Sequence, residues 1–214
     1  MDDIEKLFRS RKTVLEMFRD RGYVFKPELW IERKDDFKRL FYSKNIDFVA
    51  ETADGVPVFV KWILYLKIKP NLIKDMIEEI RTTNFQNSQN SPTEEESTHQ
   101  YPHHKIILVS KAKSNTNITK IFKDKEFRGT ELFWLNSLVF NITKHMFVPK
   151  HVRMSEEEVK ALMSELYISN KFNLPVMLKS DPITRYLNLN TGDVCRIIRY
   201  SPTSGEYYSY RVVK

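Results

Sequence analysis

The chain has 214 residues, of which 41% are hydrophobic and 29% are charged, and its net charge at pH 7 is +7. This composition is ordinary for a globular protein and excludes a chain that is disordered throughout. No apolar run approaches the roughly 20 residues of a membrane helix, and the acidic N-terminus lacks the apolar core of a secretory signal. A single cysteine, Cys195, cannot form an internal disulfide. We therefore expect a soluble intracellular protein without a membrane partner.

The N-terminal residues predict helices. Apolar side chains recur at helical spacing over residues 4–18, and Gly22 supplies a left-handed stop. Pro27 can begin a second helix, because the backbone N–H that proline lacks would have no partner within the first helical turn. That second helix would carry Leu29, Trp30, Phe37 and Leu40.

A sheet follows. Residues 46–50 and 58–64 favour two strands, joined by a hairpin turn at residues 53–55. Pro70 begins a helix with an apolar face, and residues 82–103 are so polar that a surface loop is expected. Three further segments continue the alternation of strands and helices: the apolar run at residues 105–110, a short basic helix at residues 118–122 and an apolar stretch at residues 132–142. This order predicts an α/β layered domain over residues 1–144.

Residues 145–214 predict a second, small domain of the α+β class. Ser155 followed by Glu158 is a capping box, which begins a helix. Asp181 caps another helix, whose first residue is Pro182 and which Gly192 is expected to close. Residues 194–199 and 207–213 form a closing β-hairpin. The last 35 residues are dense in turn and cap residues but hold no plausible nucleophile or metal ligand, and for the chain we expect neither a cofactor nor a metal.

Spaced residues of the second domain, with a looser set in the first, form a recognisable pattern. They are His145, Val148-Pro149-Lys150-His151, Leu174-Pro175, Asp181-Pro182, Arg185-Tyr186, Gly192, Val194, Ile197-Ile198-Arg199, Ser201, Thr203, Gly205, Tyr207, Tyr210-Arg211 and Val213, together with Arg11-Lys12-Thr13, Asp20-Arg21-Gly22-Tyr23 and Asp47-Phe48. On these residues the chain resembles the fifth-subunit family shared by the eukaryotic nuclear RNA polymerases, whose archaeal relative is similar only to the second domain. Two positions depart from the family pattern. Asn188 stands where glycine is usual, and Glu206 stands where a basic residue is common, which suggests a divergent copy of protist or large-DNA-virus origin.

The resemblance implies a non-catalytic subunit of a multisubunit DNA-directed RNA polymerase. Residues 1–144 would form a nuclease-like α/β jaw domain with a mixed sheet, beside downstream double-stranded DNA. Residues 145–214 would form an α+β assembly domain, ending in a hairpin, that anchors to the largest subunit. Other polymerase subunits and transcription factors would be further partners. The location would be the nucleus, or a viral factory or virion in the host cytoplasm for a virus-encoded chain.

Two sets of residues follow as candidate contact sites. Arginine and tyrosine are enriched in interface cores, so the first set is expected to bind partner subunits: His151, Asp181, Pro182, Arg185, Tyr186, Arg199, Tyr207, Tyr210 and Arg211. Residues 105–128 carry seven basic and two acidic residues. Non-specific contact with DNA phosphates is therefore expected from a second set: Arg9, Arg11, Lys12, Lys111, Lys113 and Lys120.

The runner-up hypothesis is a free-standing DNA-binding or nuclease-like protein. Nucleases of the restriction type need an acid, then a second acid two positions before a lysine, to hold Mg²⁺. Asp47 and Lys61 stand in suggestive places, but Phe59 occupies the position of the second acid. A metal site in the polar loop is a weaker hypothesis, based on His99, His103 and His104.

Overall fold

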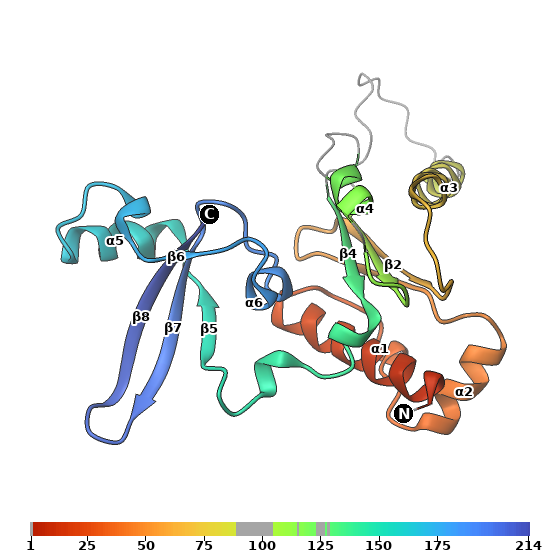
Figure 1. Ribbon diagram of the computed structural model, residues 1–214, viewed down its shortest axis with the longest axis horizontal. Helices are drawn as coiled ribbons and strands as arrows, with labels where there is room; N and C mark the ends of the chain where they lie inside the picture. Colours follow the sequence, from red (N-terminus) through yellow and green to blue (C-terminus); the bar gives the residue numbers. More distant parts are fainter. Residues whose placement is uncertain (1, 89–104, 115, 123–126, 128) are drawn as a thin grey trace. The chain divides into compact units, whose positions relative to one another are not determined.

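The computed structural model describes residues 2–88, 105–114, 116–122, 127 and 129–214 (Figure 1). Its contacts divide the chain into two compact units, Met1–Phe140 and Asn141–Lys214. Each unit combines helices with a four-stranded sheet, so the predicted α/β class with two parts is confirmed. The domain boundaries drawn from the sequence, 1–144 and 145–214, stay a prediction. Across the described ranges, no helix is both long enough and apolar enough to cross a bilayer.

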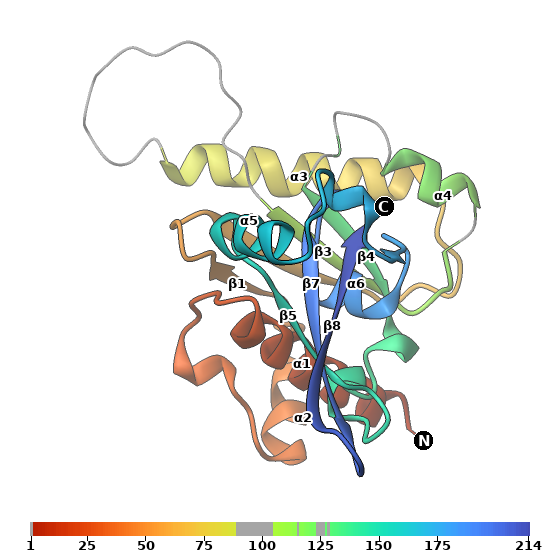
Figure 2. The same ribbon diagram turned by 90° about the vertical axis from the view of Figure 1, so that its left-hand side faces the viewer.

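The N-terminal unit is a sheet covered by helices on both faces. The strand order is β1-β2-β3-β4, with the first pair antiparallel and the other two parallel, which makes the sheet mixed as predicted. Figure 2 shows α1 and α2 on one side of the sheet and α3 on the other. The elements are α1 (Asp3–Asp20), η1 (Pro27–Leu29), α2 (Lys34–Tyr42), β1 (Phe48–Glu51), β2 (Pro57–Ile63), α3 (Pro70–Ser88), β3 (Lys105–Ser110), α4 (Thr116–Ile121), β4 (Thr130–Trp134) and η3 (Leu135–Ser137).

The α1 helix ends as its sequence predicts. Gly22 has φ +74°, and the Tyr23 amide donates to the Phe18 carbonyl at 2.8 Å. These are features of the Schellman motif, which favours glycine because a Cβ penalises positive φ. The same turn brings the Tyr23 ring against the buried Phe18 ring, with centroids 5.2 Å apart.

Two helix limits differ from the prediction. The helix expected from Pro27 is a single 3-10 turn, and α2 begins only at Lys34. The consecutive apolar residues 29–31 explain the break, because one helix face cannot bury three neighbours in sequence. The α3 helix continues through Ser88, so the polar loop expected from residue 82 begins later than predicted. Thr82 supports the continuation, because its hydroxyl donates to the Glu78 carbonyl at 3.0 Å. Residues 89–104 of that expected loop lie outside the described residues.

The C-terminal unit is built around a long hairpin. Its sheet has the order β5-β7-β8-β6, and a small core between the sheet and α5 includes Leu162, Val194 and Val212. Gly192 lies in a turn several residues beyond α6 and does not close that helix, which was expected from the sequence. The elements are η4 (Ile142–Lys144), β5 (Lys150–Arg153), α5 (Glu156–Glu165), η5 (Lys171–Asn173), β6 (Val176–Met177), α6 (Pro182–Tyr186), β7 (Val194–Ser201) and β8 (Gly205–Val213).

The capping box of α5 gives a first test. The Ser155 hydroxyl accepts from the Glu158 amide at 3.2 Å, and the Glu158 carboxylate accepts from the Ser155 amide at 2.8 Å. Ser155→Ala removes one half of this reciprocal pair and should lower the free energy of unfolding by about 1 kcal/mol. Urea unfolding of the full chain measures it. Ser164→Ala, in the last turn of the same helix, is the matched control and should cost less, because alanine is the better helix former. Equal losses in the two variants would refute the role of the cap.

Candidate docking surface of the C-terminal unit

The register of the β7–β8 hairpin assigns its side chains to two faces. Residues directly opposite each other on paired strands point to the same side of a sheet. The pairs Arg199↔Tyr207 and Cys195↔Arg211 therefore share one face, and the pairing of β5 with β7 adds His151 to it. We call His151, Arg199, Tyr207 and Arg211 the arginine face. Four predicted partner-binding residues thus lie on one side of the sheet.

The α6 helix lies on the same side. Asp181 caps it as predicted, because its carboxylate accepts from the amide of the second helical residue at 2.8 Å. The segment after the helix packs Leu189 against Cys195 and so holds α6 on the side of the arginine face. Pro182 and Arg185 are exposed on this helix. These contacts place three more predicted residues beside the arginine face.

Electrostatic interactions link His151 to its charged neighbours. Its Nδ1 donates to the Pro149 carbonyl at 2.7 Å. Burial lowers the pKa of His151, the Asp181 carboxylate opposes that shift, and the cations Arg199 and Arg211 add to it. The net direction favours an uncharged imidazole, so the positive charge of this face comes from its two arginines. Both guanidinium groups belong to exposed residues and can form two-pronged hydrogen bonds to a carboxylate.

Two predicted partner-binding tyrosines lie elsewhere. Tyr186 is only 3% exposed, and its hydroxyl accepts from Asn141 Nδ2 at 3.1 Å, so its ring belongs to the interior of the unit. Tyr210 pairs with Arg196 on the opposite face of the hairpin, where it packs against the core that includes Leu162. Neither ring therefore lies on the arginine face. The partner-binding role of the exposed residues stays a prediction.

The tip of the hairpin holds an acidic and aromatic cluster that the sequence prediction missed. Tyr200 and Tyr208 are exposed on the side of Tyr210, and both hydroxyls donate to the Glu206 carboxylate, at 2.7 and 2.5 Å. Two hydrogen bonds lower the pKa of the Glu206 carboxyl: the one from Tyr200 has the largest effect and the one from Tyr208 the next largest. Successive side chains of a strand point to opposite faces, so Glu206, Tyr208 and Tyr210 share one face and Tyr207 lies on the other. This alternation is the sequence signal from which the cluster could have been predicted.

Arg11, one of the predicted DNA-proximal residues, is not at the surface. It is 3% exposed, its Nη1 donates to the Ile46 carbonyl, and its guanidinium lies 4.7 Å from the centre of the Phe48 ring. Burial lowers the pKa of Arg11 to about 10, and the Asp47 carboxylate opposes that shift. The periodicity of α1 contained the signal, since position 11 falls within the apolar stripe of residues 4–18.

The other predicted DNA-proximal residues stay at least partly in solvent. Lys111 Nζ forms an ion pair with Asp3 at 2.6 Å, and Lys113 Nζ lies 5.7 Å from the centre of the Trp134 ring. A surface ion pair of this kind is weak and can be exchanged for a phosphate. The partly or fully exposed set comprises Arg9, Lys12, Lys111, Lys113 and Lys120.

The residues on which the nuclease hypothesis rests make structural contacts. Asp47 Oδ1 accepts from the Trp62 amide at 2.9 Å, and burial raises the pKa of this carboxyl. Lys61 Nζ forms an ion pair with Glu79 at 3.1 Å, and Phe59 supplies no metal ligand. Within the part of the chain that the structure describes, no group of three or more His, Cys, Asp or Glu residues could hold a metal. The loop candidates His99, His103 and His104 lie outside the described residues.

Comparisons with known proteins agree over both units. Residues 1–126 match the family model described as RNA polymerase Rpb5, N-terminal domain, and residues 140–213 match RNA polymerase Rpb5, C-terminal domain. A protein of Caenorhabditis briggsae, the DNA-directed RNA polymerases I, II, and III subunit RPABC1, is 29% identical over 225 residues, which cover 99% of this chain and 98% of the relative. The subunit of the same name from Caenorhabditis elegans is 28% identical over the same extent. The chain therefore belongs to the Rpb5 family of RNA polymerase subunits.

Proposed function

We propose that this chain is a non-catalytic subunit common to the nuclear DNA-directed RNA polymerases, where it anchors to the largest subunit. The relatives are named as subunits of RNA polymerases I, II, and III, which supports a shared subunit and a nuclear location. Nucleotide addition would then occur on other chains of the complex. This subunit would stabilise the assembly, and transcription factors would be further partners.

The arginine face is the observation that carries the anchoring proposal. Arg199 and Arg211 are exposed on one side of the sheet, next to the capped start of α6, while the core with α5 occupies the opposite side. Exposed arginines beside a half-buried histidine and a tyrosine have the composition of a protein interface core. The complementary surface of the largest subunit would present carboxylates or backbone carbonyls.

The N-terminal unit would form part of the lower jaw beside downstream DNA. Arg9 and Lys12 lie about one turn apart on α1, and Lys113 and Lys120 extend from the loop after β3 and from α4. Cations on such separate elements suit the phosphates of a duplex, and such contact is sensitive to salt and blind to base sequence. The jaw would therefore support the duplex without selecting a sequence.

A gentle affinity purification of the tagged chain from its native cells tests this function. The wild-type chain should copurify with the largest subunit and other polymerase subunits by mass spectrometry, and cross-linking should join the N-terminal unit to downstream DNA. Arg199→Glu with Arg211→Glu should reduce recovery of the largest subunit by about tenfold or more, as loss of central interface arginines does. Lys160→Glu, on the exposed side of α5, is the matched control and should change nothing. A solitary monomer, or equal recovery with both variants, would contradict the proposal.

A further inference from the structure

A second unusual surface lies at the carboxyl edge of the N-terminal sheet, where the parallel strands end. Leu64, Tyr65 and Leu66 follow β2 and are 38%, 60% and 79% exposed. Ile68 anchors this segment, because it is buried in the core cluster between the sheet and α3. Single exposed apolar residues are ordinary, but a contiguous run of three in solvent points to a surface that a partner could cover.

The loop after β3 lies directly beside this segment. The Lys111 amide donates to the Ile63 carbonyl at 2.9 Å, which joins the ends of β2 and β3. Trp134 Nε1, at the end of β4, donates to the Lys111 carbonyl at 3.2 Å, and Lys113 Nζ lies over the Trp134 ring. Three consecutive strand ends therefore build one continuous edge. We call Leu64, Tyr65, Leu66, Lys67, Lys69 and Lys113 the carboxyl-edge surface.

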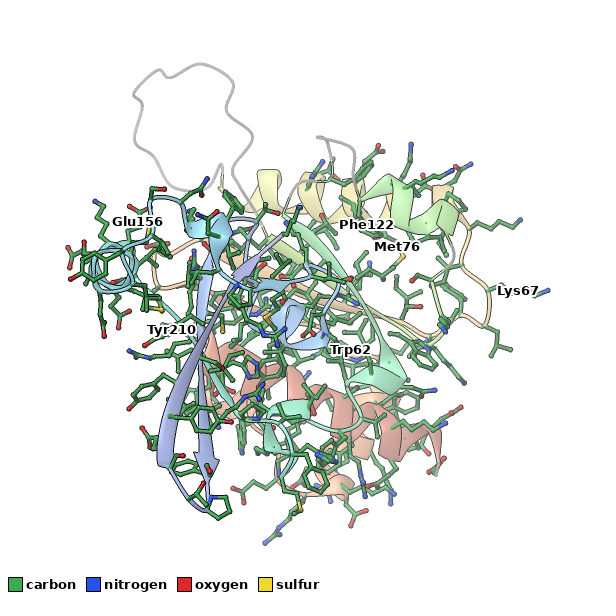
Figure 3. The ribbon with its side chains drawn as sticks, turned by 60° about the vertical axis from the view of Figure 1, so that its left-hand side comes forward. Trp62, Lys67, Met76, Phe122, Glu156 and Tyr210 are labelled. Carbon is green, nitrogen blue, oxygen red and sulfur yellow. The ribbon has the colours of Figure 1, made fainter. Side chains whose placement is uncertain are left out.

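The charge of this surface is positive. Lys67, Lys69 and Lys113 are exposed, and none of the ion pairs among the described residues engages them. Figure 3 shows Lys67 directed outward, whereas Trp62 on β2 is buried and bonds to Ser10 on α1. The α3 helix begins at Pro70, immediately after Lys69, so the positive end of its dipole adds to the same potential.

We propose that the carboxyl-edge surface binds an acidic amphipathic segment of a partner protein. The partner's leucine or aromatic side chains would cover Leu64, Tyr65 and Leu66, and its carboxylates would lie against the lysines. Burial of exposed leucines gains free energy when an apolar surface covers them, which the leucine and aromatic side chains of an amphipathic segment supply. Single-stranded nucleic acid requires several stacked aromatic rings instead, and two of the three apolar residues here are leucine. The inference does not depend on the proposed polymerase function: Lys113 also belongs to the proposed DNA-facing set, but the exposed residues Leu64, Tyr65 and Leu66 carry this proposal and its ligand is a protein.

Fluorescence anisotropy with the full chain and a labelled synthetic peptide tests the proposal. The probe is a 15-residue peptide in which leucine and phenylalanine recur at helical spacing among aspartate and glutamate. Leu66→Ser should weaken its binding by about fivefold or more, because a largely exposed side chain would lose its apolar partner. Lys67→Glu with Lys69→Glu should weaken binding by about tenfold at low salt and less at high salt. Circular dichroism checks that each variant is folded.

Two matched variants on α2 control for general effects. Tyr42→Ser removes an aromatic side chain that is 71% exposed, and Arg39→Glu reverses an exposed charge. Both should bind the peptide as the wild type does. The proposal is overturned if Leu66→Ser and Tyr42→Ser behave alike, or if a peptide with glutamine and asparagine in place of its acids binds equally well. It is also overturned if a 15-nucleotide single strand of DNA binds in a Leu66-dependent manner while the acidic peptide does not, which would assign the surface to nucleic acid.

Discussion

Glu131→Ala is expected to lower the free energy of unfolding of the N-terminal unit by about 3–5 kcal/mol, because it leaves a buried cation without its main partner. Arg21 follows the last residue of α1, and its side chain is only 2% exposed. Its two terminal nitrogens donate to the two carboxylate oxygens of Glu131 on β4, each at 2.8 Å. Burial disfavours the charged guanidinium, but the Glu131 carboxylate outweighs it and the pKa of Arg21 is raised. When the Glu131 carboxylate is removed, the free-energy cost of burying the Arg21 charge is no longer offset by its main partner.

Urea unfolding of the full chain, followed by tryptophan fluorescence, measures this loss. The matched control is Glu79→Ala, which removes the carboxylate that pairs with Lys61 at the surface of the same unit. An exposed pair of this kind contributes less than about 1 kcal/mol. The double variant Arg21→Met with Glu131→Leu should recover most of the stability, because well-packed apolar side chains replace a buried ion pair at little cost. Equal losses from Glu131→Ala and Glu79→Ala would show that Arg21 is not stabilised as a buried ion.

The parts of the fold that the sequence predicts are those with local signals. The capping box of Ser155 and the Asp181-Pro182 start of α6 each specify a helix end within four residues, and both are present as expected. Asn188 stands where the family pattern has glycine, and its φ of +51° keeps the left-handed turn that glycine usually makes. Asparagine tolerates this conformation because its short polar side chain can bond to the nearby backbone.

The site is less predictable, because its geometry depends on contacts between residues far apart in sequence. The family resemblance led to nine partner-binding candidates. It could not distinguish residues at the surface from buried residues that hold the surface in place. Tyr207 and Tyr210 look equivalent in sequence, but the hairpin register places them on opposite faces. Arg11 looked like a surface cation, but the Ile46 carbonyl and the Phe48 ring, both distant in sequence, enclose its guanidinium.

Tyr186 separates these two roles most clearly, and Tyr186→Ala is expected to destabilise the C-terminal unit by about 3–5 kcal/mol. The loss combines the burial of an aromatic ring, which is 3% exposed, with the cavity that its removal leaves. A unit of this size has only a few kcal/mol of stability from its core, so the variant should unfold locally. It should then fail to copurify with polymerase subunits because the arginine face is no longer formed.

Tyr186→Phe distinguishes a structural ring from a contact residue. It keeps the packing and removes only the hydroxyl that accepts from Asn141 Nδ2, so it should cost about 1 kcal/mol and leave copurification unchanged. Hydrogen exchange of the β7–β8 amides in the full chain reports the folding of the unit in each variant. If Tyr186→Ala kept wild-type protection in the hairpin and still lost the largest subunit, the ring would belong to the interface and its burial in the free chain would have to be relieved on binding. Loss of protection together with loss of the partner would instead assign Tyr186 to the framework that presents Arg199 and Arg211.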